Sequence, residues 1–445
     1  MIGEKDIALT RHCLEYAQEH GAQSARATLT RSVENIISTL DAAIDNITHC
    51  EDNSLEICLF VDGRYGNFST NDLGKEALED FIAKAIDTVR MLAPDPCRKL
   101  PEKERCCAAA ITGDELEIYD PQYPAVTPEL RRSIALKAAV FPHETPQYRL
   151  VSEEGEYSDT LSECYVADTQ GLHCLHRETN YDYGVEVTIE DKAGNLYSGY
   201  WWDSSERIAD FAPYDCGRTA LDNAASQIGA HPVGSGKYNM VISSDVASKV
   251  VSPLLSALNG YSLQQNNSFL QDSLGKKVFS EGLTIVDRPH IKGNCNSKLF
   301  DSEGVATIEG NIVENGVVRK YLLNTYMAAK LGMTGTVECA TRPCVMPWPR
   351  EGLDRNSILE MCGSGILVTE FNGGNCNTAT GDFSYGVEGL LFEEGKIVKP
   401  VSGMIATGNM LKLWAGFKAA GSDARRCMSK LIPTLAFSDV DFSGE

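Results

Sequence analysis

The sequence contains no apolar run long enough to span a bilayer, and it has few basic residues for its length. Lysine and arginine number 40 against 62 for aspartate and glutamate, which gives a net charge of -22. A chain this acidic repels phosphate backbones, and no basic run is longer than a pair such as Arg425-Arg426. The sequence therefore predicts no nucleic-acid partner. Glu4, Lys5 and Asp6 stand where a signal peptide would need apolar residues. We therefore expect a cytoplasmic protein without a membrane partner.

The common catalytic signatures are also missing. The chain has no Walker A sequence, no GxSxG elbow and no dinucleotide-binding GxGxxG after a strand. His173 and His176 flank Cys174 in an expected strand, but alternation places His173 on the opposite face from the other two. Without a bulge these three side chains cannot converge, so they predict no metal site.

Cysteine, by contrast, is abundant. The chain has 15 cysteines and no CxxC pair among them. Cys106 and Cys107 are adjacent, which disfavours a bridge between them. In a long acidic chain this pattern predicts reduced and mostly buried thiols rather than a disulfide framework.

Length and periodicity predict an α+β protein of more than one domain. A chain of 445 residues exceeds what one hydrophobic core usually supports, and its 43% hydrophobic residues are ordinary for a folded protein. The segment 229–237, GAHPVGSGK, is short and flexible, so we place a boundary there. We expect an N-terminal α+β domain with an antiparallel sheet over residues 1–228. Over residues 229–445 we expect a strand-rich domain that forms a curved sheet or a barrel-like structure.

The expected elements follow from apolar spacing and turn residues. In the first domain we expect helices over residues 5–20, after Thr70-Asn71-Asp72, after Thr127 and around Ala220, and strands over residues 27–37, 42–48, 55–65, 164–168, 173–179, 184–190 and 196–201. In the second we expect strands over residues 238–243, 283–287, 304–313, 317–323, 333–339, 366–371, 388–393 and 396–406. One helix starts at Asp245, and Pro253 should kink or break it.

Glycine is concentrated in residues 363–395, which hold eight of the chain's 38 glycines. Two strand-like runs flank a polar segment, residues 372–386, that we expect to be a turn-rich loop. Glycine lets another backbone approach closely, so such a loop could hold a ligand or a peptide. The alternative is a β-corner stitched together by asparagine, aspartate and threonine side chains.

A series of motifs runs in order through the second half of the chain. It includes Ser268-Phe269-Leu270, Phe300-Asp301-Ser302-Glu303-Gly304-Val305, Tyr321-Leu322-Leu323-Asn324-Thr325-Tyr326, Asn377 and Thr380-Gly381-Asp382-Phe383-Ser384. These motifs resemble the TldD/PmbA family (peptidase U62, "modulator of DNA gyrase") and, within it, the PmbA/TldE branch. The resemblance covers nearly the whole chain.

The resemblance also shows where this chain departs from a peptidase. In the TldD branch a helix carries His-Glu-x-x-x-His, in which the histidines hold zinc and the glutamate acts as general base. Here the corresponding helix reads VVSPLLSAL, and the motif aligns with Ser252, Pro253 and Ala257. A third family ligand is a cysteine near the C-terminus. Cys427 lies in that neighbourhood, but its local motif does not match, and it is more simply interpreted as a buried thiol.

The resemblance therefore implies a subunit with no catalytic residue and no cofactor of its own. Zinc is expected in a TldD-like partner, and the chain would form a heterodimer with that partner or a homodimer with itself. In either case a chamber would enclose short unfolded peptides. The loop 372–386 is then the candidate for part of the chamber wall. The candidate substrate-groove residues are Asn377, Thr380, Gly381, Asp382, Phe383 and Ser384.

Two other functions stay open. The chain could be a self-sufficient hydrolase that uses Cys376 with a distant histidine as its nucleophilic pair. The old name of the family it resembles also suggests a binding protein that modulates DNA gyrase, with acidic side chains in place of DNA phosphates. The acidic residues are spread along the chain rather than clustered, which disfavours this last function.

Overall fold

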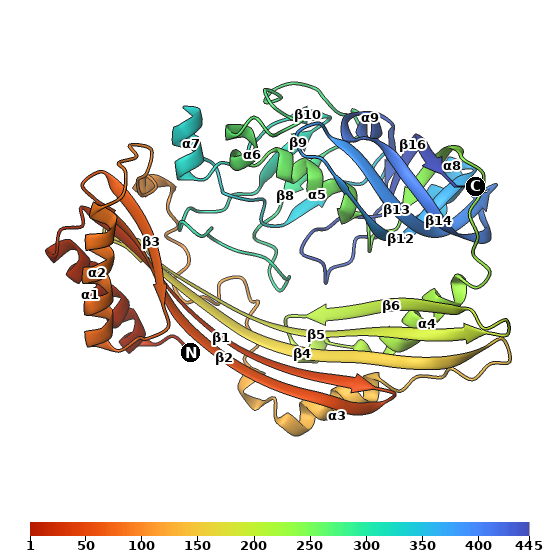
Figure 1. Ribbon diagram of the computed structural model, residues 1–445, viewed down its shortest axis with the longest axis horizontal. Coiled ribbons are helices and arrows are strands. Elements are labelled where there is room, and N and C mark those ends of the chain that lie inside the picture. The colour runs from red at the N-terminus through yellow and green to blue at the C-terminus, as the bar shows by residue number, and fades with distance from the viewer. Residues whose placement is uncertain (445) are drawn as a thin grey trace.

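The computed structural model describes residues 1–444 and has an α+β architecture, as expected (Figure 1). A six-stranded antiparallel sheet forms one layer, and a strand-rich region built from the second half of the chain lies over one face of it. Among the described residues, no helix is both long and apolar enough to cross a membrane.

The first sheet contains the longest strands of the molecule. Its order is β3-β2-β1-β4-β5-β6, and every neighbouring pair is antiparallel. The strands are β1 (Ser24–Leu40), β2 (Ala43–Val61), β3 (Arg64–Thr70), β4 (Tyr148–Asp168), β5 (His173–Asp191) and β6 (Leu196–Ser205). The four central strands run together along the length of the molecule and curve under the strand-rich region.

One face of this sheet is apolar. Odd-numbered residues such as Leu29 and Val185 are buried beneath helices, because alternate residues of a strand point to the same face. The helices are α1 (Glu4–Glu19) and α2 (Lys75–Arg90) at one end of the sheet, and α3 (Pro128–Ala138) and α4 (Cys216–Ser226) at the other. Burial of these side chains supplies the main stabilisation of this half.

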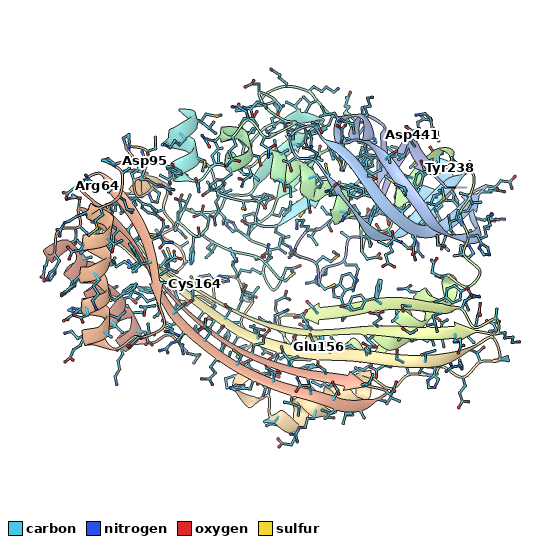
Figure 2. The ribbon with its side chains drawn as sticks, viewed as in Figure 1. Arg64, Asp95, Glu156, Cys164, Tyr238 and Asp441 are labelled. Atoms are coloured by element: carbon cyan, nitrogen blue, oxygen red, sulfur yellow. The ribbon has the colours of Figure 1, made fainter. Side chains whose placement is uncertain are left out.

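The opposite face is polar and is directed toward the strand-rich region, so that its side chains point into the space between the two layers (Figure 2). Even-numbered residues of the same strands lie there, and they line cavities between the two layers. They include Thr28, Thr30, Ser54, Glu56, Thr160, Ser162, Glu178, Asn180 and Asp182. Hydroxyl, amide and carboxylate groups of this kind keep a sheet face hydrated, so the two layers do not share one continuous apolar core.

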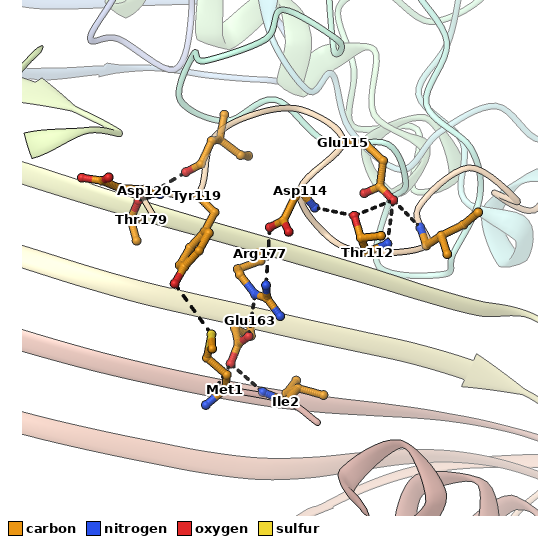
Figure 3. A network of polar contacts seen from close by, with 12 residues as sticks. Met1, Ile2, Thr112, Asp114, Glu115, Tyr119, Asp120, Glu163, Arg177 and Thr179 are labelled. Atoms are coloured by element: carbon orange, nitrogen blue, oxygen red, sulfur yellow. Dashed lines mark hydrogen bonds and ion pairs between the residues drawn. The ribbon is translucent and has the colours of Figure 1, made fainter. Parts of the chain in front are cut away.

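A polar network ties residue 2 and the segment 114–119 to β4 and β5 (Figure 3). The carboxylate of Glu163 is buried, and it accepts hydrogen bonds from the backbone N of Ile2 at 2.7 Å and from Nε of Arg177 at 2.8 Å. Arg177 also pairs with Asp114 at 3.4 Å and lies over the ring of Tyr119. The buried negative charge is therefore compensated by a cation and a backbone donor.

The strand-rich region is built around a closed five-stranded barrel. Its strands are β7 (Gly236–Ile242), β12 (Gly365–Cys376), β13 (Asp382–Glu393), β14 (Lys396–Asn409) and β16 (Leu435–Ser443). Pairing of β14 with β16 closes the ring, and only β7 and β12 pair in parallel. The helix α5 (Ser248–Ala257) packs its apolar side into the core of this region, next to the buried Trp414.

Smaller elements complete the strand-rich region. A four-stranded sheet has the order β10-β9-β8-β11. The elements are α6 (Gly260–Gln264), β8 (Ile285–Asp287), β9 (Gly310–Glu314), β10 (Val317–Val318), α7 (Thr325–Leu331), β11 (Pro343–Val345), α8 (Arg355–Cys362), α9 (Met410–Ala415) and β15 (Phe417–Ala420). Short 3₁₀ turns cover Lys103–Arg105, Tyr123–Ala125, Ile208–Asp210 and Pro213–Asp215. The hydroxyl of Tyr326 donates to Asp95 at 2.8 Å and so links α7 to the first half of the chain.

Several expected element boundaries in the first half are wrong. The expected breaks at residues 51–53 and 180–183 are absent, because β2 and β5 run through them without interruption. At both places a long neighbouring strand supplies backbone partners, which outweigh the weak local strand preference. The helix α2 starts at Lys75 with Gly74 as its N-cap, rather than being capped by residues 70–72.

The second half differs more from expectation. Residues 304–309 and 333–339 are not strands, and the expected strand at 317–323 is reduced to Val317–Val318. The helices α7, α8 and α9 were not expected, because elements of 6 to 8 residues have too few periodic positions to be recognised. The helix α5 continues through Pro253 without a break.

The glycine-rich stretch is a long hairpin, and the expected loop over residues 372–386 is wrong. β12 extends to Cys376 and β13 starts at Asp382, so only residues 377–381 form the turn. Two register shifts in the pairing absorb additional residues of β12. Gly374 has a φ of 83°, and a Cβ there would lie 1.9 Å from the carbonyl oxygen of Ser384, so only glycine fits.

Candidate functional site

A groove of about 600 Å³ lies between α5 and the β12–β13 hairpin, and we call it the α5 groove. The helix contributes Lys249, Ser252, Pro253 and Ser256 to its lining. The hairpin contributes Glu370, Phe371, Gly374, Asn375, Cys376, Thr378 and Tyr385. The fold therefore brings the helix aligned with the zinc motif against the glycine-rich stretch, two segments that are far apart in the sequence.

The three aligned motif positions do not share one environment. Ser252 and Pro253 are half-buried and line the α5 groove. Ala257 is fully buried in the core, and its carbonyl oxygen accepts a hydrogen bond from Oγ of Ser268 at 2.5 Å. Ser248 and Ser256 lie one turn before and one turn after Ser252, and both also line the groove. On this side the helix presents three hydroxyl groups, Lys249 and a proline ring, and the carboxylate of Asp245 lies just before it.

The six candidate substrate-groove residues lie around the hairpin turn, next to the α5 groove rather than in its lining. The side chain of Asn377 accepts from the backbone N of Ala379 at 2.9 Å, and Oγ1 of Thr380 accepts from the backbone N of Asp382 at 3.2 Å. Asn409 then donates to Asp382 at 2.9 Å. These hydrogen bonds are those of a β-corner that is held together by asparagine, aspartate and threonine side chains. Gly381 has a positive φ, Phe383 is buried and stacks on Tyr385, and Ser384 is exposed.

The groove has an uneven distribution of charge. Among the described residues, the ammonium of Lys249 has no carboxylate within 4.0 Å, and it lies 5.1 Å from the ring centre of Tyr385. Partial desolvation, followed by the carboxylates of Glu388 and Glu186, raises the pKa of Glu370. Glu186 belongs to β5, so this end of the groove faces the first sheet.

Cys376 has none of the surroundings of an activated nucleophile. Burial, and to a smaller extent the carboxylate of Asp382, raise the pKa of its thiol. The residues that line the α5 groove include no histidine. A thiol nucleophile needs a lowered pKa or a neighbouring base, so the geometry gives no support to a cysteine hydrolase at this place.

Cys427 lies outside the α5 groove. It lines two cavities beside the end of β6, and its backbone carbonyl accepts from Sγ of Cys295 at 3.5 Å. Burial raises the pKa of its thiol. Within residues 1–444, no group of three or more histidine, cysteine, aspartate or glutamate side chains is arranged to hold a metal ion. His176 instead contacts Glu178 at 3.1 Å, and His173 donates to a backbone carbonyl.

Three polar cavities lie between the first sheet and the strand-rich region, and sequence reasoning did not find them. Their volumes are about 640, 440 and 580 Å³. The first two share Asn296, and the last two share Ser204, Glu206 and Cys427, so the three adjoin one another. One signal could have indicated them: the hydroxyl side chains at alternate positions of long strands, as at Thr28 and Thr30.

Comparison with known proteins gives a consistent result. Models of the PmbA/TldA metallopeptidase central domain and C-terminal domain match residues 121–228 and 235–444. Metalloprotease PmbA of Escherichia coli O157:H7 is 26% identical over 426 residues, which cover 93% of this chain and 92% of that protein. A crystal structure from Bacteroides thetaiotaomicron, described as a candidate modulator of DNA gyrase, is 35% identical and matches over 100% of both chains with a TM-score of 0.94. TldE of Thermococcus kodakarensis shares the fold, at 17% identity and a TM-score of 0.81 over 98% of this chain and 100% of that one.

Proposed function

The chain belongs to the PmbA/TldD metallopeptidase family, and we propose that it is a non-catalytic subunit of a two-chain zinc peptidase. In this proposal a TldD-type partner binds the zinc and cleaves the peptide. The present chain forms the rest of the wall of the chamber that encloses the peptide. The observation that carries the proposal is the chemistry of α5, where the motif positions hold Ser252, Pro253 and Ala257.

Zinc hydrolysis requires side chains that this helix does not have. The metal needs imidazole, thiolate or carboxylate ligands, and its bound water needs a general base. Serine hydroxyls and a proline ring supply neither of these at the α5 groove. Cys427, the remaining candidate ligand, lines other cavities. Asp245, Glu370 and Cys376 also line the groove, but no three such groups among the described residues are arranged to hold a metal ion.

An enclosure for short unfolded peptides fits the two-layer architecture. The polar face of the first sheet lines cavities between the two layers, and the α5 groove lies beside Glu370, whose carboxylate is near Glu186 of that sheet. Extended peptides can enter narrow polar spaces that exclude folded domains. In this proposal the stitched corner at residues 377–384 is part of the chamber wall.

Reconstitution tests this proposal. The full chain, a TldD-type chain from the same organism, and the mixture of both are assayed for zinc content and for cleavage of an unfolded peptide. We expect the present chain alone to hold no stoichiometric zinc and to be inactive, and we expect the mixture to cleave. A mixture in which a zinc-ligand histidine of the partner is replaced serves as the control and should be inactive. Stoichiometric zinc together with cleavage by the present chain alone would contradict the proposal.

A further inference from the structure

The cavity of about 580 Å³ beside the end of β6 has more charged residues in its lining than the α5 groove or the other two cavities between the layers, and we call it the charged cavity. The end of β6 and the turn after it supply Asp203, Glu206 and Arg207, and a loop of the strand-rich region supplies Arg425 and Arg426. It shares no lining residue with the α5 groove. The sequence motifs and the proposed peptidase role leave it without a function.

Most charges in this cavity are not paired with one another. Lys292 and Glu117 form an ion pair at 2.6 Å. In the part of the chain that the structure describes, the other cations of the lining have no carboxylate within 4.0 Å, and its other carboxylates have no cation within that distance. The cations are Arg207, Arg425 and Arg426, and the carboxylates are Asp203, Glu206 and Asp210. Charged groups that line one cavity without forming direct ion pairs can each pair with a ligand.

Arg425 is held in a fixed position. Its guanidinium carbon lies 4.1 Å from the ring centre of Trp201 and 4.3 Å from that of Trp202, and Nη2 donates to the backbone carbonyl of Trp202. Nη1 is buried and has no hydrogen-bond partner among residues 1–444. Buried donors are nearly always satisfied, so a fixed guanidinium with an unused donor at a cavity is suited to bind an anionic group.

We propose that the charged cavity binds a dipeptide or tripeptide with both termini free. The peptide carboxylate pairs with Arg425 and Arg426, and its ammonium group pairs with Asp203 and Glu206. The size agrees: a sphere of this volume is about 10 Å across, and an extended chain spans at most about 3.6 Å per residue, so two or three residues fit. The inference goes beyond the proposed function, because binding requires neither zinc nor a partner chain.

Calorimetric titration of the isolated full chain tests this inference. The probe is Ala-Ala at concentrations up to about 10 mM, compared with N-acetyl-Ala-Ala and with Ala-Ala amide. We expect the free dipeptide to bind and each blocked form to bind about tenfold more weakly or worse, because one charged end loses its partner. The absence of Ala-Ala binding, or equal binding of the blocked forms, overturns the proposal.

Variants assign the two ends of the ligand. In Asp203→Asn, the advantage of Ala-Ala over N-acetyl-Ala-Ala should become smaller, since the ammonium keeps only Glu206 as a partner. In Arg425→Met, the advantage of Ala-Ala over Ala-Ala amide should become smaller, since the carboxylate keeps only Arg426. Lys399→Met, an exposed residue outside the cavity, is the matched control and should bind like the unmodified chain. If Arg425→Met fails to fold, Asp203→Asn alone tests which residues hold the peptide termini. If Asp203→Asn then binds all three peptides like the Lys399→Met control, Asp203 does not hold the ammonium group and the assignment of the termini is refuted. The measurement uses no partner, so it is independent of whether reconstitution succeeds.

Discussion

The fully buried guanidinium of Arg342 donates a hydrogen bond to the backbone carbonyl of Arg426, with 3.0 Å between Nη2 and the oxygen. It also donates to Oδ1 of Asn294 at 3.3 Å and to Sγ of Cys295 at 3.2 Å. One buried cation thus joins the two loops that line the charged cavity, and no described carboxylate lies within 4.0 Å of it.

We expect Arg342→Met to destabilise the protein and to abolish peptide binding in the charged cavity. Each buried acceptor left without a donor costs about 1–3 kcal/mol, so the free energy of unfolding should fall by about 3 kcal/mol or more. Urea denaturation measures this change, with Lys399→Met as the exposed control. A variant as stable as the control would show that the two loops do not depend on this cation.

A buried ion pair should hold α3 against the first sheet. Nε of Arg131 lies 2.5 Å from the fully buried carboxylate of Asp159, which also accepts from the hydroxyl of Tyr157 at 2.9 Å. We expect Asp159→Asn to lower the free energy of unfolding by about 3–5 kcal/mol, because it leaves a buried guanidinium uncompensated. For the pair of the exposed Arg149 and the half-buried Glu190, we expect Glu190→Gln to change the free energy of unfolding by less than about 1 kcal/mol, because Arg149 stays hydrated. Equal losses in the two variants would contradict this prediction.

Two neighbouring glycines of β12 allow a closely matched test of the hairpin. Gly373 and Gly374 both have positive φ, but only at Gly374 would a Cβ meet the backbone of the opposite strand. Gly373→Ala should lower the free energy of unfolding by about 1 kcal/mol from backbone strain alone, and Gly374→Ala by more than about 3 kcal/mol. Thermal unfolding of both variants measures the difference. Similar melting temperatures would show that the close approach at Gly374 is not needed.

The stability of the protein should depend on the ionisation of Asp301. Burial, followed by the carboxylates of Glu338 and Glu303, raises the pKa of Asp301 to about 7 from an ordinary value of 3.8. Because the folded chain then holds a proton that the unfolded chain releases, this group's contribution to stability is lost as the pH rises from about 4 to about 7.

We expect Glu338→Gln to reduce this pH dependence, since it removes a negative neighbour and lowers the pKa of Asp301. The fall in melting temperature between about pH 5 and about pH 8 should be smaller than in the unmodified protein. Glu394→Gln, in the exposed β13–β14 turn, is the control and should leave the fall unchanged. If the melting temperature of Glu338→Gln falls as much as that of the unmodified protein, Glu338 does not affect the pKa of Asp301.

Several features follow from the sequence alone because they depend on neighbouring residues. Thr127 before Pro128 predicts the start of α3, and its Oγ1 does accept from the backbone N of Leu130 at 3.2 Å. The α+β class follows from apolar spacing. The loss of the zinc motif at Ser252 and Pro253 is likewise a matter of residue identity, and the resemblance to the TldD/PmbA family rests on contiguous motifs.

The tertiary structure alone decided how far each strand extends and which side chains converge. β12 continues through residues 372–376 because β13 supplies hydrogen-bond partners there, which no local preference indicates. Helix packing determines that Ser256, rather than Ala257, faces the α5 groove with Ser252. The charged cavity gathers Asp203 and Arg425 from segments more than two hundred residues apart. Which distant side chains converge depends on how whole layers of secondary structure pack against each other. This packing is a cooperative property of the complete chain.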